Sequence, residues 1–410
     1  MNRTRLFTTV LGSVLFSTAV VAQDWPQWRG PNRDGKVTAV TVPKTWPTAL
    51  KEQWRVPVGV GHASPVVANG RIYVFARQGE EEVLLSLDAV TGKELWRSSQ
   101  PIEYKMHEAA VAHGKGPKAT PVISKGNVCT FGISGSLSCH DARTGKLKWR
   151  ESSAQYASTS PWFGVAMSPV VENGTLIAHL GGHDKGALTA FDVETGKVKW
   201  SNDLDGPAYA SPMVVTLGGV RQVVNFTQKE LIGVDVGNGK LLWRLPAKSQ
   251  YEENSVTIVP YKDTLIVSRE NLGVSALRLE KQDGQLVPKE IWNTKEPMLY
   301  LNSPVLHGNT LFGLSGKKKG QFFAIDADTG KTLWEGPGRM GENAAILNLD
   351  GKVVLLLTNE ANLIVLPADA KEFAPLAQYT VAKSATWAHP AVFGNRILIK
   401  DENSLISYAM

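Results

Sequence analysis

A nine-residue phrase recurs along this chain and constrains its fold more than any other feature. DARTGKLKW, at residues 141–149, has four close copies: DAVTGKELW, DVETGKVKW, DVGNGKLLW and DADTGKTLW. In every copy Asp stands eight residues before Trp, and Gly stands four residues before it. Self-similarity of this kind is the sequence signature of propellers and solenoids. The repeated positions are Asp88, Gly92 and Trp96; Asp141, Gly145 and Trp149; Asp192, Gly196 and Trp200; Asp235, Gly239 and Trp243; and Asp326, Gly330 and Trp334.

The chemistry of the phrase is that of a turn. A short apolar segment precedes each copy and another follows it, which predicts a strand on either side. The Asp carboxylate can accept local backbone N–H groups, and Gly supplies the positive φ that a bulged hairpin requires. The Trp ring is suited to packing against a neighbouring sheet. We therefore interpret the phrase as structural, with an altered sixth copy that ends at Trp292.

Each repeat unit also opens alike, on segments such as ASPVV, ATPVI, MSPVV, ASPMV and NSPVL. A turn and a second apolar strand follow each opening, so one unit contains four strands and matches a propeller blade. Two further units, which begin near Glu342 and Thr386, lack the phrase. The sequence therefore predicts an all-β fold, an eight-bladed β-propeller of four-stranded antiparallel blades.

The last unit ends on SLISYAM, which is only its third strand. The missing strand has a candidate near the other end of the chain, in LKEQWRVPV at residues 50–58. We expect this segment, with Trp54, to complete the last blade, because a closed ring removes exposed sheet edges. Residues 50–410 are thus predicted to form a single propeller.

The N-terminal region divides into two segments. Residues 1–22 carry Arg3 and Arg5 and then an apolar run, which predicts a signal peptide and a periplasmic or secreted protein. We expect the mature chain to start at Gln23, without a lipid anchor or a transmembrane segment. Residues 23–49, which include DWPQWRGPNRDG, are expected to form an extended arm across the outside or one face of the propeller.

Few residue patterns point to chemistry. The formal net charge of +6 is spread along the chain, and with the expected export it argues against nucleic acid as a partner. No H-E-x-x-H spacing predicts a metal site, and no catalytic motif is found. Cys129 and Cys139 flank a turn, so an oxidising compartment permits a disulfide, although two buried free thiols are favoured.

Candidate binding residues come from the propeller geometry. Ligands of propellers usually bind at the axis, where the loops that enter the innermost strands converge. The aromatic insertion YASTSPWFGVAM, at residues 156–167, either packs over the end of the ring or forms a stacking platform for a flat or carbohydrate-like ligand. The axial candidates are His62, Lys118, Trp162, Phe163, Tyr209, Asn254, Asn302, Glu342, Asn343, Trp387 and His389.

The repeat signature D-x-x-T-G-K-x-x-W resembles that of the PQQ-like (pyrroloquinoline-quinone-type) propeller family. DWPQWRGPNRDG, GGVRQVVNFTQKELIGVDVGNGKLLWR and TWAHPAVFGNRILIKDENSLISYAM are similar to segments of a secreted bacterial subfamily. That subfamily resembles the propeller scaffold of the outer-membrane β-barrel assembly machinery. The resemblance covers essentially the whole chain after residue 22.

The resemblance implies two functional classes. Quinoprotein alcohol dehydrogenases bind PQQ and calcium on the axis with a vicinal Cys pair, an acidic catalytic residue and a stacking aromatic residue. The chain lacks the vicinal pair and a C-x-x-C-H segment. We therefore expect an exported, monomeric, non-catalytic binding or scaffold propeller without a cofactor, whose partner is an envelope protein or a small ligand. The alternative is a PQQ- and Ca²⁺-dependent dehydrogenase of alcohols or sugars, with Trp162 or Trp387 on the cofactor and Glu342 and Asn343 near calcium.

Overall fold

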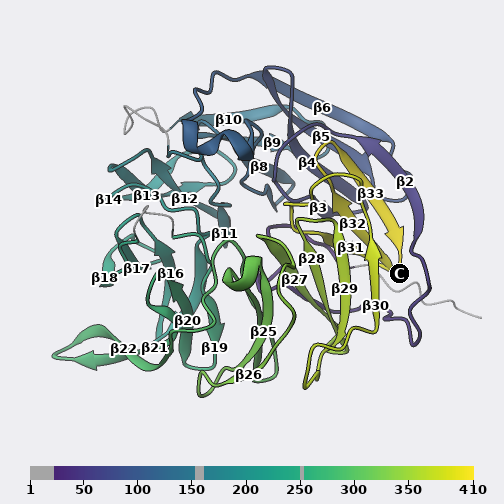
Figure 1. The fold of residues 1–410 in the computed structure, drawn as a ribbon. Helices are drawn as coiled ribbons and strands as arrows, with labels where there is room; N and C mark the ends of the chain where they lie inside the picture. The colour runs from purple at the N-terminus through teal and green to yellow at the C-terminus, as the bar shows by residue number, and fades with distance from the viewer. Residues whose placement is uncertain (1–22, 153–160, 250–253) are drawn as a thin grey trace, which may run out of the picture.

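Eight sheets stand around a common axis in the computed structural model, which describes residues 23–152, 161–249 and 254–410 (Figure 1). The expected signal segment, residues 1–22, lies outside these ranges. Each blade has four antiparallel strands, which follow chain order from the axis outward in blades 1 to 7, and the seventh also receives a short parallel strand from the N-terminal arm. The predicted eight-bladed, all-β propeller is confirmed.

The strands of the first four blades have the following bounds. Blade 1 contains β3 (Val66–Ala68), β4 (Arg71–Gln78), β5 (Glu81–Asp88) and β6 (Glu94–Pro101). Blade 2 contains β7 (Val122–Ser124), β8 (Asn127–Phe131), β9 (Ser136–Asp141) and β10 (Leu147–Ser152). Blade 3 contains β11 (Val170–Glu172), β12 (Thr175–Gly181), β13 (Gly186–Asp192) and β14 (Val198–Leu204). Blade 4 contains β15 (Met213–Leu217), β16 (Val220–Phe226), β17 (Glu230–Asp235) and β18 (Leu241–Pro246).

The second half of the ring repeats this pattern. Blade 5 contains β19 (Val259–Tyr261), β20 (Thr264–Arg269), β21 (Gly273–Gln282) and β22 (Gln285–Thr294). Blade 6 contains β23 (Val305–His307), β24 (Thr310–Ser315), β25 (Gln321–Asp326) and β26 (Thr332–Glu335). Blade 7 contains β27 (Ala344–Leu349), β28 (Val353–Thr358), β29 (Asn362–Pro367) and β30 (Ala377–Thr380). Blade 8 contains β31 (Ala391–Phe393), β32 (Arg396–Lys400), β33 (Ser404–Ala409) and β2 (Lys51–Pro57).

The ring closes as expected, by pairing strands from opposite ends of the chain. Strand β2 pairs antiparallel with β33, and Trp54 lies opposite Ser407. In Figure 1 the purple strand β2 runs along the outside of the yellow strand β33. The outermost position of blade 8 is therefore filled by residues that precede blade 1.

The middle strands of the blades carry the core. Strand β28, VVLLLT, is buried at every position, because a sheet stands against each of its faces. The outermost strand β6 instead alternates exposed and half-buried side chains, as expected for a strand with one face toward solvent. Short 3₁₀ helices, η1 (Glu108–His113) and η3 (Lys317–Lys319), lie in connections. None of the helices in the described ranges is long and apolar enough to cross a membrane.

The repeated phrase forms the turn between the third and fourth strands of a blade. In blade 2 the Asp141 carboxylate accepts the N–H groups of Arg143 at 3.1 Å and Thr144 at 2.8 Å, and the Thr144 hydroxyl at 2.7 Å. These hydrogen bonds, led by that of the Thr144 side chain, lower the pKa of Asp141. Gly145 has φ +76°, the left-handed conformation that the turn requires.

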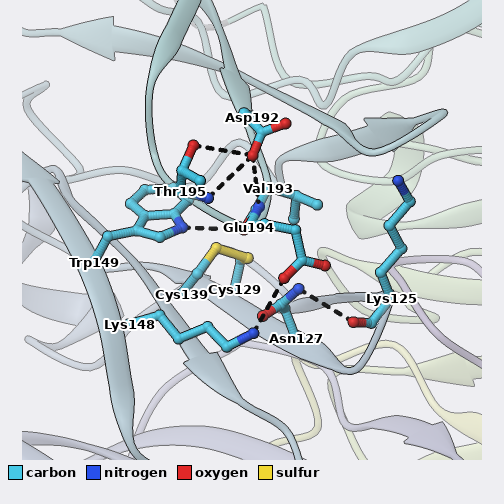
Figure 2. The surroundings of a disulfide bond; sticks show 10 residues. All are labelled: Lys125, Asn127, Cys129, Cys139, Lys148, Trp149, Asp192, Val193, Glu194 and Thr195. Atoms are coloured by element: carbon cyan, nitrogen blue, oxygen red, sulfur yellow. Dashed lines mark hydrogen bonds and ion pairs between the residues drawn. A yellow bond between two sulfur atoms is a disulfide. The ribbon is translucent and has the colours of Figure 1, made fainter.

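The Trp of the phrase binds the turn of the next blade. Trp149 on β10 donates its indole N–H to the carbonyl of Val193 in blade 3 at 3.0 Å, above the turn that Asp192 and Thr195 close (Figure 2). Trp243 is an exception, since it donates to Gln222 within its own blade. The blade that follows Trp243 is blade 5, the one with the altered turn. Equivalent bonds to the next blade are made by Trp54, Trp96, Trp200, Trp292 and Trp334.

The repeated blade openings form a second, inner set of bonds between blades. In blades 1 to 6 the Ser or Thr of the opening accepts the backbone N–H of its counterpart in the preceding blade, as in the Ser64 N–H to Thr120 hydroxyl bond of 3.1 Å. The N–H of His389 in blade 8 donates to the Ser64 hydroxyl at 2.9 Å, so this belt continues across the ring closure. The acceptor hydroxyls of the belt are Ser64, Thr120, Ser168, Ser211, Thr257 and Ser303.

The two cysteines form a cross-strand disulfide between the buried Cys129 and Cys139 (Figure 2). The prediction of two free thiols, which the sequence favoured, is therefore wrong. The reason is the register of β8 and β9, which places these two residues directly opposite each other. The spacing alone could not fix that register.

The N-terminal arm, which was expected across the outside or one face of the propeller, packs against the innermost strands of the ring. Trp25 pairs with Val67 of β3, and its side chain is fully buried. Strand β1 (Lys36–Val37) then pairs parallel with β27. On the way, the Arg33 guanidinium donates to the carbonyls of Ser168 and Pro169, both at 2.9 Å. The arm thus contacts innermost strands on opposite sides of the axis.

The contact between Trp and the turn glycine can be tested with two matched substitutions in blade 2. A Cβ added to Gly145 would lie 2.5 Å from the Trp96 ring, whereas a Cβ on Gly126, at φ +73°, meets nothing within 4 Å. Both substitutions to Ala impose the left-handed cost of about 1–2 kcal/mol. We expect Gly145→Ala to lower the free energy of unfolding by about 1–3 kcal/mol more than Gly126→Ala, because it also overpacks the contact. Equal losses in urea unfolding would contradict the contact.

Candidate functional site

A cavity of about 210 Å³ lies on the axis, where the connections into the innermost strands converge. Every blade contributes to its wall through the residues that precede or begin its first strand. The arm contributes Trp28, and the connection between blades 1 and 2 contributes His113. The lining consists of Trp28, His62, Ser64, His113, Lys118, Phe163, Ala166, Tyr209, Ser255, Tyr300, Leu301, Ser303, Asn343, Trp387 and His389.

Aromatic rings form a continuous chain along one side of the cavity. His62 stacks on Trp387, with ring centroids 5.3 Å apart and planes inclined by 13°. His113 meets Trp387 edge-on at 5.3 Å and Phe163 at 5.5 Å. Phe163 in turn meets Tyr209 at 5.7 Å. Edge-to-face contacts of this kind fix the rings against one another, so this wall is preformed.

Trp28 is held in place by the rest of the arm. The guanidinium groups of Arg29 and Arg33 lie 5.5 and 5.7 Å from its ring centroid, within the range of cation–π contacts. His389 meets the same ring edge-on at 5.3 Å. Both arginines are buried, and burial lowers the pKa of Arg29 to about 10 and that of Arg33 to about 9. Arg29 also donates to the carbonyl of Pro304 at the start of blade 6.

The cavity carries a positive charge that no lining residue neutralises. Burial lowers the pKa of Lys118 to about 8, so its amine is mainly protonated at neutral pH. Its Nζ atom is buried and has no hydrogen-bond partner among the described residues. None of the described residues that line the cavity is an Asp or a Glu.

The three lining histidines are uncharged at neutral pH. Burial, followed by the charge of Lys118, lowers the pKa of His62 to about 3. Burial, followed by the charge of Arg29, lowers the pKa of His389 to about 3. Burial and then Lys118 also lower the pKa of His113. The imidazoles therefore offer polar ring atoms without competing with Lys118 for an anion.

The structure brings together most of the residues that the sequence placed at the axis. His62, Lys118, Phe163, Tyr209, Asn343, Trp387 and His389 line the cavity. Trp28 and His113 were not among the candidates. The signal for Trp28 was the arm DWPQWR, whose two Trp residues follow no strand alternation.

Four candidates lie outside the lining. The Asn254 amide donates to the carbonyls of Thr227 and Ala247, and the Asn302 amide both donates to and accepts from the Leu314 backbone, so both hold connections in place. Trp162 and Glu342 also do not line the cavity.

Trp162 takes part in a separate stack on the same connections. It lies between His107 and His183, at centroid distances of 5.2 and 4.9 Å. Residues 156–160 of the aromatic insertion lie outside the described ranges.

Sequence comparison places the chain in a family. The protein family described as outer membrane protein assembly factor BamB matches residues 34–115 and 79–336. The chain belongs to this family of PQQ-like propellers. The BamB of Yersinia pestis is 21% identical over 370 residues, which are 86% of this chain and 87% of that protein. This confirms the resemblance seen in the repeat phrase.

Several other relatives are enzymes, and solved structures of both kinds of relative share the fold. Quinohemoprotein alcohol dehydrogenase ADH-IIG of Pseudomonas putida is 25% identical over 305 residues, which span 66% of this chain but only 39% of the enzyme. The solved quinohemoprotein alcohol dehydrogenase of Comamonas testosteroni superposes with a TM-score of 0.70 at 14% identity, covering 94% of this chain and 80% of that one. BamB of Moraxella catarrhalis gives 0.62 at 13% identity, covering 88% and 98%. At these identities the superpositions show the fold alone.

The residues of the cavity do not fit a calcium–quinone centre. Calcium takes six to eight oxygen ligands, usually with carboxylates among them. The described lining supplies no carboxylate, and it places the unpaired Lys118 amine where a second cation would be repelled. Asn343 lines the cavity, but Glu342, the acidic neighbour expected near calcium, does not.

The neutral histidines predict a specific pH dependence of stability. Because the pKa of His389 falls from 6.5 to about 3 on folding, the unfolded chain binds the proton first as the pH drops. Stability is therefore fully present above pH 6.5 and is lost progressively toward pH 3. For one such histidine the loss from pH 7 to pH 5 is about 2 kcal/mol.

We expect His389→Gln to reduce the pH dependence of unfolding by up to this amount, as measured by urea titrations at pH 7 and pH 5. The matched control is His307→Gln, which changes a histidine outside the cavity. An unchanged pH dependence in the His389 variant would show that His389 is not buried as a neutral group.

Proposed function

We propose that this chain is an exported, non-catalytic binding propeller and that its ligand enters the axial cavity. The observation that carries this proposal is the lining itself, to which all eight blades contribute aromatic or polar side chains. A concave, mainly aromatic pocket with a few convergent polar groups is the usual form of a small-molecule site. No carboxylate stands among the described lining residues to act as a general acid or to orient a histidine.

The rigidity of the site supports binding. The hydroxyl belt joins neighbouring blades at the positions where the wall residues begin, as in the His389 N–H bond to Ser64. The arm fixes Trp28 through the two buried arginines. A ligand would therefore meet side chains that are already ordered, which reduces the entropy cost of binding.

The family members favour two different functions. The outer membrane protein assembly factor BamB of Yersinia pestis matches most of this chain, which favours a scaffold for envelope proteins, and its name also favours export. The alternative is a PQQ- and Ca²⁺-dependent dehydrogenase, which the quinohemoprotein relatives favour. We prefer the binding role because the donor set of the cavity does not fit calcium.

A reconstitution experiment separates these hypotheses. Purified protein is incubated with PQQ and Ca²⁺, and dye reduction is measured with a panel of alcohols and aldose sugars. A quinoprotein dehydrogenase reconstituted in parallel is the positive control. We expect no turnover above the background of free PQQ, whereas turnover that depends on the protein would contradict the non-catalytic role.

The position of the ligand site is tested by thermal shift, because a ligand that binds the folded state raises the Tm. A panel of small metabolites is screened against the wild type and against Trp387→Ala, which removes part of the aromatic wall. The control is Tyr261→Ala, which lies outside the cavity lining. We expect hits whose shifts disappear only in the Trp387 variant. Shifts that persist in that variant would place binding elsewhere.

A further inference from the structure

The unneutralised charge of the cavity indicates the class of ligand. The Lys118 amine is buried without a hydrogen-bond partner among the described residues, and the two histidines on which its charge acts, His62 and His113, are neutral at pH 7. The charge of Glu342 also acts on His113, but Glu342 does not line the cavity. Lys400 also acts on His62, but its amine is bound to the carbonyls of Gly61 and Asp401. An unpaired buried cation is costly, and an entering anion would offset that cost.

A second unpaired atom adds a requirement for a donor. The Asn343 side-chain oxygen is buried without a hydrogen-bond partner in the described structure, and Asn343 lines the same cavity. An amide oxygen accepts hydrogen bonds only, so it needs a ligand N–H or O–H group. A ligand that carries only acceptors, such as benzoate, would satisfy Lys118 but leave Asn343 unpaired.

The aromatic surfaces set the shape of the ligand. Trp28 and Trp387 line the cavity, and Phe163 and Tyr209 continue the wall. Such rings offer flat apolar faces on which the ring of a ligand can stack. The cavity volume of about 210 Å³ limits the ligand to a small molecule.

We propose that the axial cavity selects a small ring compound that carries one carboxylate and at least one hydroxyl group. The carboxylate pairs with the Lys118 amine, a hydroxyl donates to the Asn343 amide oxygen, and the ring packs on the tryptophans. This inference rests on the proposed binding function. Two kinds of compound carry these groups, namely sugar acids and hydroxylated aromatic acids. The experiment tests each kind separately.

Calorimetric titration of the full mature chain tests the selectivity. The first series of titrations compares glucuronate with glucose. The second series compares 4-hydroxybenzoate with 4-hydroxybenzyl alcohol and with benzoate. We expect at least one acid to bind tenfold or more tightly than its neutral partner, which is a difference of about 1.4 kcal/mol. In the second series, 4-hydroxybenzoate should also bind more tightly than benzoate.

Substitutions of Lys118 and Asn343 test which side chain is responsible for each preference among the ligands. Lys118→Met should remove the preference for the acid and retain any binding of the neutral partner, and Lys118→Gln provides a second variant of different polarity. The control is Lys115→Met, an exposed lysine of the same connection. Asn343→Leu should remove the preference for 4-hydroxybenzoate over benzoate.

The outcomes separate this inference from the proposed function. Equal binding of acids and neutral partners, or a preference that survives both Lys118 substitutions, overturns the ligand class. If none of these probes binds while other compounds give shifts that depend on Trp387, the ligand class is wrong and the binding function stands. If no compound gives such shifts, both are wrong.

Discussion

No blade of this propeller can bury its two faces alone, so the fold depends on the contact between one blade and the next. That contact is repeated at two radii. Near the axis, backbone N–H groups bind the hydroxyls of the blade openings, and at the rim Trp rings bind the turns of the following blade. The repeated phrase is therefore the docking element of the ring, and Trp54 makes the same contact across the closure.

The central channel of the ring presents a different physical problem, because backbone carbonyl groups just before the innermost strands need hydrogen-bond donors. The arm solves it with two buried arginines that donate to the carbonyls of Pro304, Ser168 and Pro169. Buried polar groups need such partners. By filling the channel the arm also places Trp28 under the cavity, so the same segment that completes the core provides part of the candidate site.

The fold could be predicted from the sequence because the same pattern of strands and turns occurs in several repeats. Blade number and ring closure were both read from recurring positions, and the axial candidates followed from where the first strands begin. The contacts of the arm could not be predicted because it has no repeat, and the carbonyls that Arg33 binds lie more than a hundred positions away in the sequence. Asn254 and Asn302 were overestimated because side-chain bonds to local carbonyls leave no trace in the sequence. The cysteine pairing depended on strand register in the same way.

The central claim is that the arm closes the channel and builds a preformed cavity above it. Native-state hydrogen exchange of the arm tests it most directly, because the amides of Trp25 and Gly35 donate to the carbonyls of Val67 and Arg29 inside the ring. The account predicts that these two amides exchange as slowly as those of the innermost strands. Exchange at the rate of an exposed loop would show that the arm does not occupy the axis and that the cavity lacks its Trp28 surface.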